Sequence, residues 1–198
     1  QRGETIAIVG ESGSGKSVTS LSIMRLLPKK VGRISRGAIR LRGRDLVPIS
    51  DRDMRAVRGK QIGMIFQEPM TRLNPVHTIG HQIAEVVIQL EKASKAAAHK
   101  RAIEMLELVG IPEPARRAGA FPHQLSGGQR QRVMIAMALA CKPKLLLANE
   151  PTTALDATVR AQILDLLSAL QKQYRMAVLM ITHDLNLVHR LADRVAVM

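Results

Sequence analysis

Cysteine and aromatic residues are scarce in this sequence of 198 residues, which contains one cysteine, one tyrosine, two phenylalanines and no tryptophan. The single cysteine, Cys141, excludes an internal disulfide and a metal or iron–sulfur site built from several cysteines. We expect it to be a small packed residue near a helix end. The scarcity of aromatic rings leaves little on which nucleic-acid bases could stack.

Long apolar runs are absent as well. The longest, Val133–Cys141, is less than half of the roughly 20 residues that a transmembrane helix needs. The first residues enter a strand pattern at once, without the basic start and small-residue cleavage site of a secretory signal. With 46% hydrophobic residues, the sequence predicts one globular domain of a cytoplasmic protein, and any membrane role must come through a partner.

Acidic residues are few relative to basic ones: 16 Asp and Glu oppose 30 Lys and Arg, for a formal net charge of +14. Such an excess can attract nucleic acid, phosphorylated ligands or an anionic membrane surface. Five arginines are clustered, at Arg33, Arg36, Arg40, Arg42 and Arg44. Because so few aromatic residues accompany them, we interpret the cluster as a basic face near a lipid surface, and we expect no nucleic-acid partner.

Four short, nearly continuous apolar runs predict strands that are buried on both faces, as in a parallel sheet covered by helices. These runs are Ile6–Val9, Ile62–Phe66, Leu145–Ala148 and Ala177–Ile181. Helical patterns over Lys16–Leu27, stopped by Pro28, and over Arg160–Tyr174 lie between them. The alternation predicts an α/β fold.

Two segments depart from this alternation. Ala38–Leu46 alternates apolar and basic residues and predicts a half-exposed strand of an antiparallel patch. From Ile79 to Val109 the apolar spacing is helical. We therefore expect a helical subdomain, spanning about residues 70–140, inserted in a single domain of residues 1–198.

The segment from Gly10 to Ser17, Gly-Glu-Ser-Gly-Ser-Gly-Lys-Ser, matches the P-loop pattern and lies between a predicted strand and a predicted helix. Its glycines let backbone amides converge on phosphates, and the positive end of the helix adds to the field. We expect Lys16 to reach the β- and γ-phosphates of a nucleotide and the Ser17 hydroxyl to bind Mg²⁺. The predicted nucleotide-binding residues of the loop are Gly10, Ser12, Gly13, Ser14, Gly15, Lys16 and Ser17.

Asn149 and Glu150 follow the predicted strand Leu145–Ala148, where a sheet would deliver side chains to a metal and an attacking water. Glu150 is the candidate general base that polarises water for in-line attack on the γ-phosphate. A helix-capping role is the alternative, because Pro151 begins a turn directly afterwards.

The segment Leu125–Gln129, Leu-Ser-Gly-Gly-Gln, is a second helix start that could bind phosphate. Together with the P-loop and the strand before Glu150, it resembles the signature sequence of ABC ATPases. The resemblance implies a P-loop NTPase (RecA-like) fold in which two such domains pair head to tail. Ser126, Gly127 and Gly128 of one domain would then close over the ATP held by the other. Taken alone, the segment could also be an ordinary helix N-cap.

Three further positions match the motifs of this family. The resemblance places Gln67 in the Q-loop, where its amide would reach Mg²⁺ and water and sense the transport partner. It places Asp156 in the D-loop, which crosses the dimer interface, and makes His183 the switch histidine that contacts the γ-phosphate and steadies the attacking water. The implied catalytic residues are Glu150, His183 and Gln67, and the implied metal-binding residues are Ser17, Gln67 and Asn149.

Two longer stretches, which include the motifs and the residues between them, narrow the resemblance. Ile62–Ile83 and Phe121–Asp156 are similar to the sequences of ATP-binding subunits of oligopeptide, dipeptide and nickel importers and of microcin C type importers. The resemblance implies an ATP-hydrolysing peripheral subunit on the cytoplasmic face of the bacterial inner membrane, with ATP and Mg²⁺ as ligands. The implied partners are transmembrane permease subunits, a second ABC ATPase domain and, indirectly, a periplasmic solute-binding protein. The transported solute is determined by other subunits.

Two features depart from the family pattern. Asn149 stands where the family has an aspartate that holds Mg²⁺ through water, and the amide removes one negative charge from the metal site. We expect weaker Mg²⁺ binding and slower, though not abolished, turnover. Only nine residues precede Gly10, so the upstream strands and the aromatic residue that stacks on adenine are missing. We expect a fragment, truncated at both ends, that binds the base weakly.

Two other functions stay open at this point. A DNA-associated ABC ATPase would fit the positive charge, but only roughly 60 residues separate Gln67 from Ser126, too few for a long coiled coil, and no cysteine pairs suggest zinc. An ATP-binding module that regulates without hydrolysing would fit Asn149.

Overall fold

A computed structural model describes residues 2–11, 13–28, 30, 32–67, 72–153 and 155–198, and a parallel sheet of strand order β4-β5-β6-β1-β7 forms its centre. The strands of this sheet are β1 (Thr5–Val9), β4 (Ile62–Ile65), β5 (Leu145–Asn149), β6 (Ala177–Ile181) and β7 (Arg194–Val197). The helices are α1 (Lys16–Ile23), α2 (Asp51–Val57), α4 (Ile79–Glu91), α5 (Lys95–Leu108), α6 (Pro114–Arg117), α7 (Gly127–Leu139), α8 (Ala157–Tyr174) and α9 (Leu185–Leu191), with a 3₁₀ turn at Pro122–Gln124. The α/β fold predicted from the apolar runs is confirmed, and β7, whose residues are all exposed, is a strand beyond the four predicted ones.

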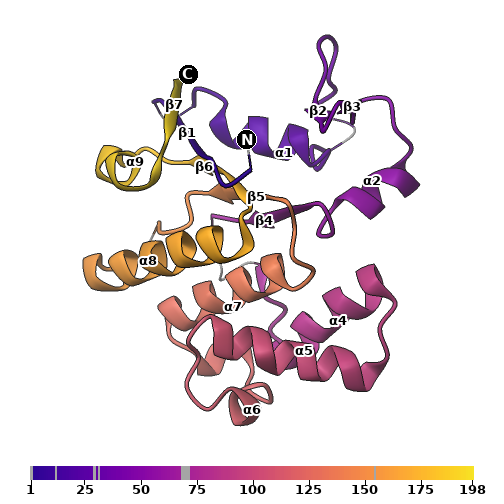
Figure 1. Ribbon diagram of the computed structural model, residues 1–198, viewed down its shortest axis with the longest axis vertical. Helices are drawn as coiled ribbons and strands as arrows, with labels where there is room; N and C mark the ends of the chain where they lie inside the picture. The colour runs from indigo at the N-terminus through magenta and orange to yellow at the C-terminus, as the bar shows by residue number, and fades with distance from the viewer. Residues whose placement is uncertain (1, 12, 29, 31, 68–71, 154) are drawn as a thin grey trace.

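Helices cover both faces of the sheet, with α1 above it and α7 below it in Figure 1. Neighbouring residues of β5 show the two sides. Leu146 belongs to the larger core, which it shares with residues of α4, α5, α7 and α8, whereas Leu147 belongs to a smaller core with residues of α1 and α2. Because all strands of the sheet are parallel, the loops after β1, β4, β5 and β6 leave from the same edge.

Helix α1 is shorter than its sequence pattern indicates. The pattern predicts a helix that continues to Leu27, but α1 ends at Ile23, and Arg25 takes a left-handed backbone conformation with φ of 48°. The Arg58 guanidinium donates to the backbone carbonyls of Met24 and Arg25 at 2.8 and 2.7 Å. These carbonyls are bonded to a side chain from a distant segment, and no local pattern could indicate that.

The antiparallel patch is a hairpin, and the prediction of a single strand over Ala38–Leu46 is wrong. Strands β2 (Arg40–Leu41) and β3 (Arg44–Asp45) pair with each other in antiparallel register. The two residues between them, Arg42 and Gly43, have φ of 52° and 84°. Two successive left-handed residues make the tight turn that suits a two-residue hairpin. In Figure 1 the chain at β2 and β3 projects from the top of the molecule.

Helices α4, α5, α6 and α7, which we call the helical group, lie between β4 and β5 in the chain and form the lower part of Figure 1. Thr78 caps α4 and Ser94 caps α5, each by accepting a hydrogen bond from a backbone amide of the first turn. The first residues of the predicted subdomain, 70 and 71, lie outside the described residues.

Cys141 is a buried residue directly after the helical group, as predicted. Burial raises the pKa of its thiol to about 11, which leaves little thiolate at neutral pH. Within the described part of the chain, no helix is both long enough and apolar enough to cross a membrane.

Candidate functional site

Four loops meet at the carboxyl edge of the sheet and carry the residues that the sequence singled out. They are the P-loop after β1, Gln67 after β4, Glu150 after β5 and His183 after β6. Gln67 and His183 lie 83 and 33 residues from Glu150 in the chain, yet both contact its carboxylate. The structure therefore brings together all three predicted catalytic residues, in the crevice where open α/β sheets bind ligands.

The P-loop closes around the ammonium group of Lys16. Its Nζ donates to the backbone carbonyls of Gly10 and Glu11 at 2.8 and 2.6 Å and lies 3.4 Å from Ser14 Oγ. Lys16 is only 7% exposed. Backbone carbonyls of the loop thus fix the position of this positive charge. Ser12, also predicted to bind nucleotide, lies outside the described residues.

Helix α1 begins without a capping side chain. Its N-cap is Gly15, with φ of 98°, and Gly13 also has a left-handed φ, of 87°. A side chain at either position would strain the backbone. Because Gly15 has no side chain with which to cap the helix, the first amides of α1 are available to an anion, and the helix dipole favours negative charge there.

Ser17 and Asn149 face each other where the predicted metal site lies. Ser17 Oγ donates to Asn149 Oδ1 at 3.4 Å, and Asn149 is 6% exposed. Mg²⁺ prefers oxygen ligands and is commonly held by one or two carboxylates together with substrate phosphates and water. The two oxygens fit this chemistry, but neither is charged. Among the described residues, no cluster of three His, Cys, Asp or Glu side chains is placed to hold a metal.

Glu150 is the centre of the polar contacts at this edge. Its Oε2 accepts hydrogen bonds from Gln67 Nε2 and Thr153 Oγ1, both at 2.9 Å, and its Oε1 lies 3.3 Å from His183 Nδ1. The Glu150 side chain is 14% exposed and that of His183 is 65% exposed. One carboxylate oxygen is therefore held by two donors, while the other lies beside an accessible imidazole.

The backbone of Glu150 is left-handed, with φ of 45°. Such a conformation costs a non-glycine residue about 1–3 kcal/mol, and residues of this kind are concentrated at functional sites. Glu150 is not a helix cap, since the residues after it form turns and α8 is capped by Asp156 instead. The capping alternative raised by the sequence is thus excluded.

Two residues that form hydrogen bonds near Glu150 were not predicted from the sequence. Thr153 is the hydrogen-bond donor described above, and its only sequence signal is its position three residues after Glu150. Gln131 of α7 is 1% exposed, and its Nε2 donates to the backbone carbonyl of Pro151 at 2.5 Å. Gln131 therefore connects the helix that begins at the signature segment to the residue directly after Glu150.

The signature and D-loop residues cap helices instead of joining this cluster. Ser126 Oγ accepts from the Gln129 amide, and Gln129 Oε1 accepts from the Ser126 amide. Asp156 Oδ1 accepts from the Val159 amide at 2.9 Å. The two helix starts are adjacent, because a Cβ at Gly128 would lie 2.6 Å from Val159 Cγ1. Within the described residues, no hydrogen bond or ion pair joins either start to the P-loop or to Glu150.

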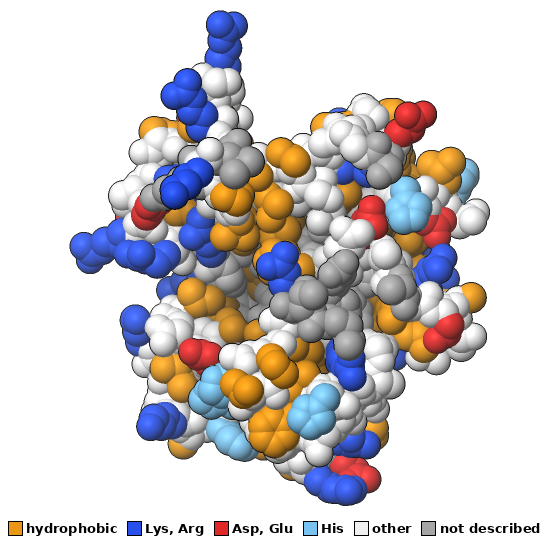
Figure 2. All heavy atoms as spheres, turned by 180° about the vertical axis from the view of Figure 1, so that it is seen from behind, with side chains coloured by type: hydrophobic (Ala, Val, Ile, Leu, Met, Phe, Trp, Pro, Cys, Tyr) orange, Lys and Arg blue, Asp and Glu red, His pale blue; other side chains and the backbone are white. Residues whose placement is uncertain are grey.

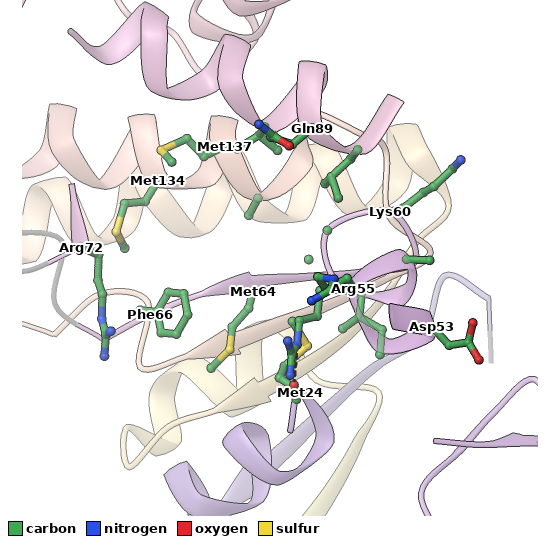
Figure 3. A pocket seen from close by; sticks show the side chains of 18 of the residues that line it. Met24, Asp53, Arg55, Lys60, Met64, Phe66, Arg72, Gln89, Met134 and Met137 are labelled. Carbon is green, nitrogen blue, oxygen red and sulfur yellow. Dashed lines mark hydrogen bonds between the residues drawn. The ribbon is translucent and has the colours of Figure 1, made fainter. Parts of the chain in front are cut away.

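A cavity of about 940 Å³ lies between the helical group and the segment of α2 and β4 (Figure 3). Apolar side chains that include Met64, Phe66 and Met134 line it. The Arg72 guanidinium lies 4.5 Å from the centre of the Phe66 ring. The basic side chains that line the cavity are Arg52, Arg55, Arg58, Lys60, Arg72 and Lys92, whereas Asp53 is its one acidic side chain among the described residues. Phe66 directly precedes Gln67, so the cavity adjoins the Q-loop.

Residues 1–153 match the family described as ABC transporter, and the chain belongs to this family. It is 62% identical over 197 residues to the oligopeptide transport ATP-binding protein OppD of Bacillus subtilis (strain 168), covering 100% of this chain and 55% of the relative. It is 55% identical over 197 residues to the dipeptide transport ATP-binding protein DppD of the same organism, covering 100% of this chain and 59% of the relative. The chain thus spans somewhat more than half the length of these relatives.

Solved structures of ATP-binding cassettes have the same fold. A dimeric post-hydrolysis state of the ATP-binding cassette MJ0796 bound to ADP and Pi matches with a TM-score of 0.84 and 33% identity, covering 100% of this chain and 82% of that one. The CbiO1 protein of Clostridium perfringens, part of the ABC transporter complex CbiONQ, matches with a TM-score of 0.83 and 29% identity, covering 100% of this chain and 74% of that one. The P-loop NTPase fold predicted from the resemblance is confirmed.

Proposed function

We propose that this chain is the ATP-binding and ATP-hydrolysing part of a subunit that energises peptide import across the bacterial inner membrane. The convergence of Lys16, Glu150, Gln67 and His183 at one sheet edge is the observation that carries the proposal. The relatives are peptide transport ATP-binding proteins by name, which supports peptides as the transported solute.

In this proposal Glu150 is the general base. Since Gln67 and Thr153 both donate to Oε2, the free electron pairs of Oε1 are the ones that accept a proton from water. The water oxygen forms a bond to the γ-phosphorus, and the bond from that phosphorus to the bridging oxygen of ADP breaks. His183, beside Oε1, holds the water in line, and Lys16 stabilises the negative charge that develops on the phosphate oxygens.

Ser17, Gln67 and Asn149 are the residues that would hold Mg²⁺. When bound, the ion would neutralise negative charge on the phosphates of ATP. With an amide at position 149, the phosphates and Glu150 provide the negative charge of the site. We therefore expect a higher Mg²⁺ requirement than an aspartate would give, with hydrolysis slowed but retained.

Two such domains would pair head to tail, so that Ser126, Gly127 and Gly128 of one cover the ATP on the P-loop of the other. Asp156 would lie at the interface between them. A dimeric form of the similar cassette MJ0796 supports this arrangement. We also propose that the helical group is an inserted subdomain of this single domain.

The cavity beside Phe66 is the proposed docking site of the transmembrane permease subunits. Its apolar lining and basic side chains favour an amphipathic helix that carries acidic residues. An occupant that moved Phe66 would also move Gln67, the next residue in the chain. Because Gln67 donates a hydrogen bond to Glu150, a change in the cavity would reach the catalytic carboxylate through these two residues. The subunit would lie peripherally on the cytoplasmic face of the inner membrane, with the periplasmic solute-binding protein acting on it indirectly.

Magnesium-dependent phosphate release from ATP by the full-length protein tests the proposal, with Glu150→Gln as the control. Loss of a general base lowers the rate by about 10²–10⁴-fold while ATP binding persists. ATP binding without phosphate release in either protein would favour a regulatory module that does not hydrolyse ATP, the second candidate, which Asn149 motivates. The names of the relatives offer no support for a DNA-associated ATPase.

A further inference from the structure

The positive charge of the chain is concentrated in one segment. Residues 25–60, which we call the basic arm, contain 12 of the 30 basic residues and three of the 16 acidic ones. They contribute +9 of the formal net charge of +14. The arm begins in the turn after α1 and includes the β2–β3 hairpin and helix α2. A charge excess of this size in so short a segment is far from the mixed signs of an ordinary protein surface.

Most of these charges face solvent without an acidic partner. The ion pairs that the structure gives within the arm are Arg25–Asp51 and Arg44–Asp53. Other arginines of the arm are exposed and have no carboxylate within ion-pair distance among the described residues; they include Arg33, Arg36, Arg40, Arg42 and Arg52. Figure 2 shows basic side chains, in blue, on the projecting part of the molecule at the upper left.

The chemistry of the arm suits a phosphate-rich surface that needs no stacking. No aromatic residue occurs in residues 25–60, so bases of single-stranded nucleic acid would find no ring to stack on. The apolar residues of the hairpin, Ile39 and Leu41, pack against the smaller core instead of pointing outward. The exposed side chains of the hairpin are mainly guanidinium groups. Such groups suit the anionic headgroups of lipids better than the bases of a nucleic acid.

The arm is also continuous with the proposed permease-docking cavity. Arg52 and Arg55 of α2 belong to the arm and line the cavity as well. If a membrane protein occupies that cavity, the arm lies on the membrane side of the subunit, within reach of the inner leaflet. This step depends on the proposed function.

We propose that the basic arm binds the anionic phospholipid headgroups of the cytoplasmic leaflet directly. The contact is electrostatic, because the arm presents mainly guanidinium groups, and Leu26, 38% exposed, is the one exposed large apolar side chain among its described residues. It gives the subunit a second attachment beside the permease and orients α2 at the mouth of the docking cavity.

The experiment measures partition of the full-length protein, without ATP, onto vesicles made of equal parts phosphatidylglycerol and phosphatidylcholine. Each arginine near an anionic surface changes the partition by about fivefold. Combined replacement Arg36→Gln, Arg40→Gln and Arg42→Gln should therefore weaken it by about a hundredfold. The matched control is Lys95→Gln, Lys100→Gln and Lys172→Gln, three exposed cations outside the arm, for which we expect a change of less than about fivefold.

Binding to the anionic vesicles that weakens with salt, is absent on pure phosphatidylcholine and is lost in the arm variant supports the proposal. Equal loss in both variants, no binding to anionic vesicles, or arm-dependent binding to duplex DNA but not to vesicles overturns it. The replaced side chains are exposed, so the melting temperature checks that the fold is retained. Phosphate release from ATP, measured in parallel, is expected to be unchanged in the arm variant, so that failure of lipid binding is distinguished from failure of the proposed ATPase function.

Discussion

Two helices of this chain begin at candidate phosphate-binding segments, and their first turns differ. The N-cap of α1 is Gly15, which has no side chain, and the neighbouring Lys16 is held by carbonyls of the loop. The N-cap of α7 is Ser126, whose hydroxyl and amide both bond to Gln129 in a reciprocal capping box. One start is thus open to an anion, whereas the other is closed on itself.

The difference indicates different roles for the two segments. An open helix start with a fixed lysine is a preformed site, so it can bind phosphate within a single chain. A self-capped start loses a hydrogen bond when its serine turns to a ligand, so it binds only when other contacts compensate. We infer that the P-loop acts first and that the signature segment joins when a second domain supplies those contacts.

The largest effect should come from Lys16→Ala. Two charge-assisted hydrogen bonds to phosphates, at about 1.5–3 kcal/mol each, would be lost, and ATP affinity should fall by at least about a hundredfold. Equilibrium binding of a fluorescent ATP analogue measures this, with Lys172→Ala as the control for an exposed lysine elsewhere. Unchanged affinity in the Lys16 variant would mean that the open helix start is not the phosphate site.

Ser126→Ala should separate the two segments. Phosphate release by the full-length protein should fall by about 10–100-fold, as expected for one lost hydrogen bond to a charged phosphate. Affinity of a single chain for ATP should stay unchanged, and loss of the cap should lower the free energy of unfolding by about 1 kcal/mol. A Ser126→Thr control keeps the hydroxyl. Weaker ATP binding by the isolated domain would contradict the assignment of this segment to a partner's nucleotide.

Gln131→Leu should break the link between the two regions. It leaves the buried carbonyl of Pro151 without its donor, which costs about 1–3 kcal/mol in the free energy of unfolding. Because the left-handed turn at Glu150 loses its support, kcat should fall by about tenfold with KM for ATP unchanged. Urea denaturation and steady-state kinetics measure the two effects, and Gln173→Leu, at an exposed glutamine of α8, is the matched control. A loss of stability without a change in kcat would leave Gln131 a packing residue only.

The smallest effect should come from Asn149→Asp, which restores a charge beside Ser17. A charged acceptor strengthens the hydrogen bond to a metal-bound water by about 1 kcal/mol. The Mg²⁺ concentration for half-maximal phosphate release should therefore fall by about fivefold. If the variant hydrolyses ATP no faster than the parent at low Mg²⁺, Asn149 does not limit the metal site.

The sequence predicted the strands and the residues that follow them, because both depend on residues that are neighbours in the chain. The four apolar runs all became strands of the parallel sheet, and Glu150 and His183 each stand two residues after the end of one of these runs. Their meeting at one edge follows from the parallel arrangement alone. The boundaries were less predictable, because Arg58 ends α1 from outside the helix and Gly43 turns a predicted strand into a hairpin.

The sequence by itself thus determined the strands, the P-loop and the identities of the residues at the sheet edge, since these depend on spacing and side-chain chemistry. Only the tertiary structure decided which oxygen of Glu150 is held by Gln67 and Thr153, and that Gln131 supports the turn after it. It also decided between the two roles that the local pattern left open for Ser126, which caps its own helix. The contacts of Gln67 and Gln131 join segments far apart in the chain, and the choice of oxygen depends on the orientation of one side chain, so neither is encoded in a local pattern.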